Sequence, residues 1–184
     1  VSFLNAWKEK LPWRAQEHFG VIAHPAFDIG VAELIFPIWQ GWTRTLITKE
    51  ILANADEMIR TFNEITAFHM VPTLLAHWID TIPSDQKPRI IMTGGDRVPP
   101  SIQSSLKRKF QAAILFQFYG PSECSVLTSG FENKGQFPME TLPLGTPFSN
   151  ASIHIVTPEL RPCSPFEEGE IVISGPAVGL GYAN

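Results

Sequence analysis

Short apolar runs alternate with amphipathic stretches along the first two thirds of the chain, and this alternation restricts the fold more than any other feature. The pattern predicts strands over 19–23, 43–48, 67–71, 89–93 and 114–118, and helices over 2–10, 28–41, 56–65, 73–79 and 99–110. Apolar strands that are separated by helices form a parallel sheet with helices on both faces. We therefore expect an α/β fold with a parallel sheet flanked by helices.

Proline, glycine and capping residues give the expected helix ends. Pro37 should kink or end the helix that opens at Asp28, and Gly41 should close it. Asp56 is expected to cap the next helix. The helix that opens at Asp28 carries one apolar face, which consists of Val31, Leu34, Ile35 and Ile38.

The pattern changes after about residue 124. Strands are predicted over 125–131, 152–156 and 170–174, with turn-rich joins and no helices between them. Pro83-Ser84-Asp85 is predicted to be a loop, and the segment 133–145 to be a linker. We expect two units: a parallel α/β unit over 1–132, and the truncated start of a mostly antiparallel, barrel-like β unit over 133–184.

Composition excludes several classes of protein. The 184 residues are 44% hydrophobic and 17% charged, with a net charge of −4, so no basic footprint for nucleic acid or anionic lipid is present. Cys124 and Cys163 are too few and too far apart for a metal site or a disulfide framework. No apolar run among these residues is long enough to span a bilayer, and the first residues lack the charged, apolar and small-residue succession expected of a signal peptide. We expect a cytoplasmic protein.

Polar residues follow the ends of several predicted strands. Asp28, His69, the Gly94-Gly95 pair and the stretch Tyr119 to Glu123 all lie at or just past such ends. Because parallel strands share a direction, these positions should converge at one edge of the sheet, where open α/β folds bind ligands. The alternatives are a helix N-cap role for Asp28 and a solvent-exposed turn at 119–123.

Four stretches in a fixed order resemble a known family. They are Phe27-Asp28-Ile29-Gly30-Val31-Ala32-Glu33, Thr93-Gly94-Gly95-Asp96-Arg97-Val98-Pro99-Pro100, Tyr119-Gly120-Pro121-Ser122-Glu123, and Gly169 to Gly175 running into Gly181-Tyr182. Together they resemble the adenylation domains of nonribosomal peptide synthetases, which belong to the adenylate-forming superfamily. The matches extend from residue 27 to residue 182. Unit 1–132 would then bind substrate and nucleotide.

The resemblance assigns roles to individual residues. Asp28 would pair with the α-ammonium of an amino acid, and Glu123 would hold Mg²⁺. The remaining substrate-pocket residues would be Ile29, Ala32, His69, Met92, Gly94, Phe118, Val126 and Leu127. The ATP or AMP site would consist of Gly94, Gly95, Asp96, Arg97, Gln117, Tyr119, Gly120 and Ser122. Gln117 stands where the family usually has an asparagine.

This pocket would hold no acid other than Asp28 and no lysine or arginine, which suits a neutral, medium-sized apolar or aromatic amino acid. His69 would either bind a substrate hydroxyl or be a core histidine with its own partner. Which amino acid is selected, the peptide product and the oligomeric state cannot be read from the sequence.

The resemblance implies an ATP-dependent ligase that forms aminoacyl-AMP and passes the acyl group to a carrier-protein thiol. The family's phosphate loop and catalytic lysine are missing from these residues, so the chain resembles a central fragment that is inactive by itself and needs the remainder of its domain. Two alternatives stay open: an acyl-CoA ligase of the same superfamily, and a degenerate or engineered segment that binds without catalysis.

Overall fold

The computed structural model describes residues 1–82, 88–134 and 138–183. The helices are α1 (Ser2–Lys10), α2 (Asp28–Gln40), α3 (Lys49–Ala53), α4 (Ala55–Phe62), α5 (Pro72–Trp78) and α6 (Pro100–Lys109), with a 3₁₀ turn, η1 (Ser122–Cys124). The strands are β1 (His18–Val21), β2 (Thr43–Leu46), β3 (Ala67–His69), β4 (Ile90–Gly94), β5 (Ile114–Tyr119), β6 (Ser129–Asn133), β7 (Thr146–Pro147), β8 (Ser152–Val156) and β9 (Glu170–Ser174).

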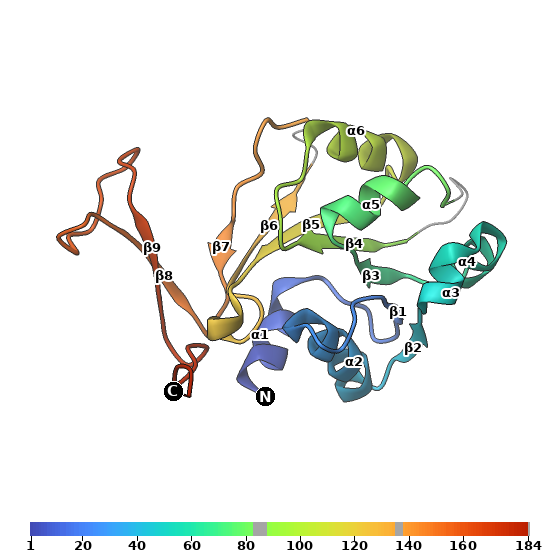
Figure 1. Cartoon of the computed structure of the whole chain (residues 1–184), viewed down its shortest axis with the longest axis horizontal. Helices are drawn as coiled ribbons and strands as arrows, with labels where there is room; N and C mark the ends of the chain where they lie inside the picture. The colour runs from blue at the N-terminus through green and yellow to red at the C-terminus, as the bar shows by residue number, and fades with distance from the viewer. Residues whose placement is uncertain (83–87, 135–137, 184) are drawn as a thin grey trace.

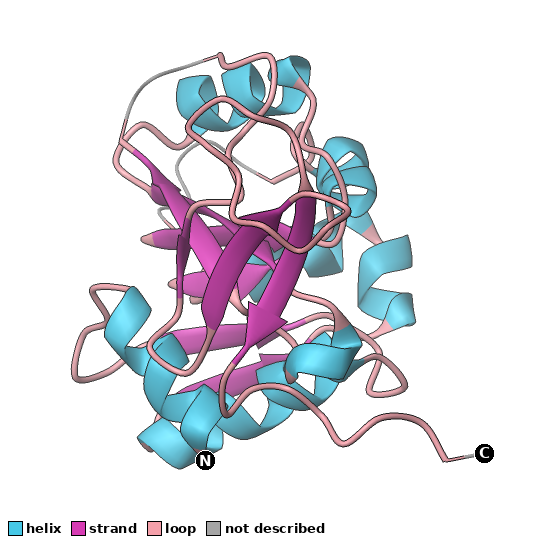
Figure 2. Ribbon diagram, turned by 90° about the vertical axis from the view of Figure 1, so that its left-hand side faces the viewer, coloured by secondary structure: helices cyan, strands magenta, loops and turns pink. Residues whose placement is uncertain are grey.

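A seven-stranded sheet forms the centre of the molecule, in the order β2-β1-β3-β4-β5-β6-β7. The first five strands of this order run parallel, and β6 and β7 join the β5 side as antiparallel strands. Helices lie on both faces of the sheet (Figures 1 and 2). The predicted α/β class with a mostly parallel, helix-flanked sheet is therefore confirmed.

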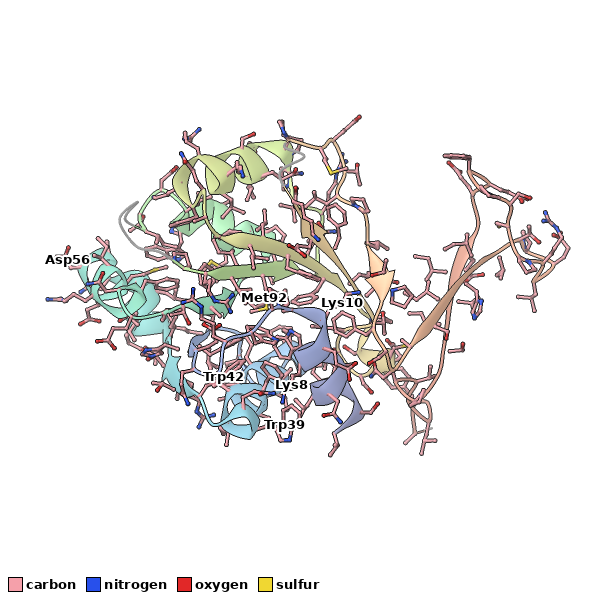
Figure 3. The ribbon with its side chains drawn as sticks, turned by 180° about the vertical axis from the view of Figure 1, so that it is seen from behind. Lys8, Lys10, Trp39, Trp42, Asp56 and Met92 are labelled. Carbon is pink, nitrogen blue, oxygen red and sulfur yellow. The ribbon has the colours of Figure 1, made fainter. Side chains whose placement is uncertain are left out.

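Two apolar clusters cover the two faces of the sheet. On one face, Trp7 of α1 and Phe36 of α2 pack with Phe118 of β5, and the ring centroids of Trp7 and Phe36 are 4.3 Å apart. On the other face, residues of α4, α5 and α6 pack against β3, β4 and β5. Lys8 of α1 also lies over the ring of Trp39 of α2, at 5.7 Å from its centroid (Figure 3). These contacts hold α1 and α2 together beneath the sheet.

Helix α2 is apolar on two faces. It continues through Pro37 to Gln40, where Gly41 ends it with a φ of 73°, so the proline does not end the helix. From the sequence, one apolar face was expected on this helix. Three of its members, Val31, Ile35 and Ile38, are exposed, and Leu34 is half-buried. The side that faces the sheet instead carries Ala32, Glu33 and Phe36.

The region between β2 and β3 also departs from expectation. A short additional helix, α3, precedes α4. The Thr48 hydroxyl caps it by accepting a hydrogen bond from the backbone N–H of Ile51. Asn54, not Asp56, caps α4: its side-chain oxygen accepts from the backbone N–H groups of Asp56 and Glu57. The predicted cap at Asp56 is wrong because the helix begins earlier. The loop predicted at 83–85 lies outside the described residues.

The last third of the chain contains a second, smaller sheet. Strands β8 and β9 pair as an antiparallel hairpin that stands apart from the seven-stranded sheet (Figure 1). The strand expected at 125–131 begins only at Ser129, since the residues before it form a turn. The division into units 1–132 and 133–184 stays a prediction.

A buried ion pair lies near the start of the parallel strands. The Glu17 carboxylate accepts hydrogen bonds from the side chains of Arg89 and Thr66 and from the backbone N–H of Arg14. Burial by itself raises the pKa of Glu17, but these hydrogen bonds outweigh it, so the pKa is lowered overall. Glu17 therefore favours the folded state when it is ionised.

Replacing Glu17 by glutamine is expected to lower the free energy of unfolding by about 3 kcal/mol near neutral pH, because Arg89 keeps a buried charge without its partner. Because folding lowers the pKa of Glu17, its stabilising effect is present when the pH is above the pKa of the unfolded state. This effect is lost as the pH falls through the pKa of the folded state. Urea denaturation between pH 7 and pH 3 should show the difference between wild type and Glu17→Gln shrinking at acid pH. A constant difference would contradict this account.

Candidate functional site

Asp28 and Ser122 meet at the edge of the sheet where the parallel strands end. The Ser122 hydroxyl donates to Oδ2 of Asp28 at 2.5 Å, although the two residues are 94 positions apart in the chain. Oδ1 of Asp28 accepts from the backbone N–H of Ile29 at 2.6 Å. Phe27 occupies the N-cap position of α2, so Asp28 is not the cap residue. The expected convergence of these two loops is thus present.

A tight turn after β5 presents Ser122 and Glu123. Ser125 and Val126 adopt φ values of 58° and 80°, a conformation that is unfavourable for residues with a side chain, above all for a β-branched one. Gly120 fits because a Cβ there would lie 2.3 Å from the carbonyl oxygen of Val126. This close approach folds the turn back on itself and leaves the side chains of Ser122 and Glu123 exposed at the edge of the sheet.

A cavity of about 420 Å³ lies beside this turn. Six of the eight residues predicted for the nucleotide line it, namely Gly95, Asp96, Arg97, Gln117, Tyr119 and Gly120. Gly94 and Ser122 are not among its lining residues. The guanidinium of Arg97 donates to the carbonyl oxygen of Glu140 and to the hydroxyl of Thr141, which also lines the cavity. The volume is in the range of small-molecule sites.

Gln117 leaves a hydrogen-bonding group unused in the cavity wall. Its side chain is buried, and its Oε1 has no hydrogen-bond partner within the described part of the chain. A buried, unpaired amide oxygen is costly, and a ligand with an N–H donor can offset that cost. The free Oε1 of Gln117 therefore suits a ligand that presents an N–H group to this wall of the cavity.

Glu123 is held by a residue from the far end of the chain. The hydroxyl of Tyr182 donates to Oε1 of Glu123 at 2.7 Å, and the backbone N–H of Gly179 donates to the Glu123 carbonyl. The hydrogen bond from Tyr182 lowers the pKa of Glu123 and raises the pKa of Tyr182. Tyr182 was absent from the predicted site, although its Gly-Tyr motif already marked the segment.

Across residues 1–82, 88–134 and 138–183, no three His, Cys, Asp or Glu side chains are grouped so that they could hold a metal ion. Glu123 is exposed and offers a single carboxylate. Mg²⁺ is commonly bound by one or two carboxylates together with substrate phosphates. Glu123 therefore fits a magnesium ion that is brought with a nucleotide.

The residues predicted for the amino-acid pocket lie together on the α2 side of the sheet. Ala32, Met92, Phe118 and Leu127 belong to one buried cluster, and Ile29 and Val126 pack against it. Gly94 lies so close to β5 that a Cβ there would be 2.7 Å from the carbonyl oxygen of Phe118. Phe118 is the member of this set that also lines the 420 Å³ cavity. The amino-acid and nucleotide sets therefore adjoin at Phe118.

One acid was missed in this region. Glu33 of α2 is fully buried, and its Oε1 lies 2.9 Å from Nδ1 of His69. Its Oε2 accepts from the backbone N–H groups of Ile22 and Ala23 at 2.7 and 2.9 Å. Glu33 therefore adds a buried acid beside His69, outside the set of residues predicted for the pocket. Glu33 could have been found from the sequence, because it is a charged residue among the apolar residues of the helix predicted over 28–41.

Comparison with known proteins decides the family. The family model described as AMP-binding enzyme matches residues 1–183. The chain belongs to the AMP-binding enzyme family. Among curated relatives, bacitracin synthase 1 of Bacillus licheniformis is 28% identical over the whole chain, and gramicidin S synthase 2 of Brevibacillus brevis is 32% identical over 95% of it. The chain spans 4% of the length of each of these two proteins.

Solved structures of other proteins share the fold. CmiS6 superposes with a TM-score of 0.88 at 22% identity, over 98% of this chain and 46% of that one. A four-domain nonribosomal peptide synthetase, AB3403, bound to AMP and glycine, gives a TM-score of 0.86 at 22% identity, over 98% of this chain and 14% of that one. The described part of this family member contains no helix of the length and hydrophobicity that crossing a membrane requires.

Proposed function

We propose that this chain is the amino-acid-selecting core of an adenylation domain of a nonribosomal peptide synthetase. The observation that carries the proposal is the contact between Asp28 and Ser122 beside the 420 Å³ cavity. It places a carboxylate suited to an ammonium next to a hydroxyl suited to a phosphate. A single aminoacyl adenylate can therefore reach both groups and the cavity.

The cavity residues would bind the nucleotide. The half-buried ring of Tyr119 offers a face for adenine, and Oε1 of Gln117 can accept from the adenine amino group. Ser122 would exchange its bond to Asp28 for one to the α-phosphate. ATP supplies the α-phosphorus that the amino-acid carboxylate attacks, with pyrophosphate leaving. Glu123 would bind the accompanying Mg²⁺, and Tyr182 would orient that carboxylate.

Asp28 and the apolar cluster would select the amino acid. A carboxylate next to Ile29, which packs against the apolar cluster, favours a substrate with an ammonium group and a neutral side chain. This arrangement favours an α-amino acid over the amine-free acids of an acyl-CoA ligase. The relatives that are peptide synthetases support a phosphopantetheine-bearing carrier protein as the partner that receives the acyl group. Catalysis by the whole domain needs residues beyond this chain.

Titration of the 184-residue chain with a non-hydrolysable aminoacyl sulfamoyl adenosine tests the proposal. We expect saturable thermal stabilisation, because a ligand that binds only the folded state raises the unfolding temperature with concentration. Tyr119→Ala should weaken binding by about tenfold through loss of the stacking surface. No saturable stabilisation with any of the aminoacyl analogues would favour a scaffold segment instead.

A further inference from the structure

Another cavity lies at the edge of the sheet where the parallel strands begin. Its volume is about 700 Å³, and its lining includes Thr66, Arg89 and Ala113, the residues that precede β3, β4 and β5. The candidate functional site lies where the same strands end, so the length of a strand, on the order of 15 Å, lies between the two cavities. The proposed function does not use this other cavity.

Four cationic side chains line the cavity, which we call the basic cavity. They come from three parts of the chain: the segment before β1 (Arg14), the residue before β4 (Arg89), and the last turn of α6 (Arg108 and Lys109). None of the described residues that line it is an aspartate or a glutamate. The negative end of the α6 dipole accounts for the two cations of that helix. It does not account for Arg14 and Arg89, which belong to other elements.

Two of the four cations are held at the wall by contacts within the protein. The guanidinium of Arg89 donates to Glu17, and its Nε has no hydrogen-bond partner among the described residues. The ammonium of Lys109 donates to the backbone carbonyl oxygens of Ile79 and Asp80. These contacts fix where both positive charges lie.

The other two cations, Arg14 and Arg108, form no ion pair with a carboxylate in the described part of the chain. Both side chains are exposed, and Arg108 donates to the hydroxyl of Ser105, which is uncharged. Burial lowers the pKa of Lys109, and the charge of Arg108 adds to this effect, although the charge of Asp80 opposes it. The positive charges of the basic cavity therefore repel one another, and an anion among them can offset this repulsion.

We propose that the basic cavity binds a small molecule through a phosphate group. A phosphate group carries a charge of about −1.5 to −2 at pH 7, which matches the two arginines that have no carboxylate partner. Arginine also suits phosphate in shape, because its planar guanidinium can donate two parallel hydrogen bonds to the phosphate oxygens.

The volume and the rest of the lining leave room for more than the phosphate. A volume of about 700 Å³ is in the range of small-molecule sites. Pro88, Phe110 and Ala112 also line the cavity and offer apolar surface to an organic group. The phosphate can therefore belong to an organic molecule or to an inorganic anion such as pyrophosphate, and the experiment below separates these two sources.

A titration followed by proton–nitrogen NMR tests the inference and locates the ligand. The probes are fructose bisphosphate, inorganic pyrophosphate and uncharged fructose, at about 0.15 M salt so that weak surface attraction is screened. We expect saturable shifts with at least one phosphate probe, at the backbone amides of 111–113 and at the Nε–H signals of Arg14, Arg89 and Arg108. Fructose should cause none. Tighter binding of fructose bisphosphate assigns the cavity to organic phosphates, and equal or tighter binding of pyrophosphate assigns it to the inorganic anion.

The double variant Arg14→Gln/Arg108→Gln should weaken binding of the phosphate probe by about tenfold or more. Both positions are exposed, and Arg14 contacts Glu17 through its backbone N–H, which glutamine keeps, so the fold should be preserved. The matched control is Arg44→Gln/Arg161→Gln, which removes the same charge from two exposed positions outside the lining. It should leave the affinity within about twofold of wild type.

Three results would overturn the inference: no saturable shift with either phosphate probe, shifts confined to the turn at 119–123, or equal losses of affinity in the double variant and its control. None of them bears on the proposed function, because neither Arg14 nor Arg108 lines the 420 Å³ cavity.

Discussion

Replacing Asp28 by asparagine is expected to weaken binding of an aminoacyl sulfamoyl adenosine by about 100-fold. Asparagine keeps the size of the side chain, an oxygen that can accept from Ile29 and an NH₂ that can donate to the Ser122 hydroxyl, but it removes the charge that meets the substrate ammonium. Removing one member of a desolvated charge pair costs about 2–5 kcal/mol. Isothermal titration of wild type and Asp28→Asn measures the ratio of the two affinities.

Two controls separate the charge effect from a loss of structure. Asp56→Asn makes the same change in the first turn of α4, where the side chain is exposed and lies far from the site (Figure 3). It should leave the affinity unchanged. An adenylate analogue without the α-amino group should bind wild type and Asp28→Asn alike. If Asp28→Asn bound the aminoacyl analogue within about threefold of wild type, Asp28 would not be the ammonium partner.

Replacing Gly30 by alanine is expected to destabilise the fold by about 3 kcal/mol or more. A Cβ at this position would lie 2.2 Å from the carbonyl oxygen of His24 and 2.9 Å from that of Ala23. Both are backbone atoms that cannot turn away as a flexible side chain can, so the start of α2 must move. Urea denaturation measures the loss of unfolding free energy, and the displacement of Asp28 should also weaken ligand binding.

Gly41→Ala is the matched control for this substitution. Gly41 ends the same helix with a φ of 73°, but a Cβ there would meet nothing within 4 Å. Gly41→Ala should lower the free energy of unfolding only through the left-handed backbone conformation, by about 1–2 kcal/mol. Equal losses from the two substitutions would contradict the account, because the steric contact at Gly30 would then add nothing.

The sheet was predictable because its signal is local. Each parallel strand is a short apolar run between helical patterns, and the direction that such strands share places their ends at one edge. Proximity of Asp28 to Ser122 follows from that topology alone, before any contact is known. Most of the residues predicted for the nucleotide also lie together, since six of the eight line one cavity.

Other features depend on contacts that no local pattern records. Helix α2 is apolar on two sides, so periodicity alone could not show which side packs against the sheet. The pairing of Glu33 with His69 joins two elements that are distant in the chain. The late start of β6 follows from the left-handed turn at Ser125 and Val126, residues whose types do not favour that conformation.

The most direct test is a crystal structure of the chain with a bound aminoacyl sulfamoyl adenosine. The account predicts the ligand's ammonium within about 3 Å of the Asp28 carboxylate and its adenine in the cavity between Gln117 and Tyr119. Ser122 should turn from Asp28 to the sulfamate, which stands for the α-phosphate. A ligand bound elsewhere, or one whose ammonium lies away from Asp28, would contradict the account.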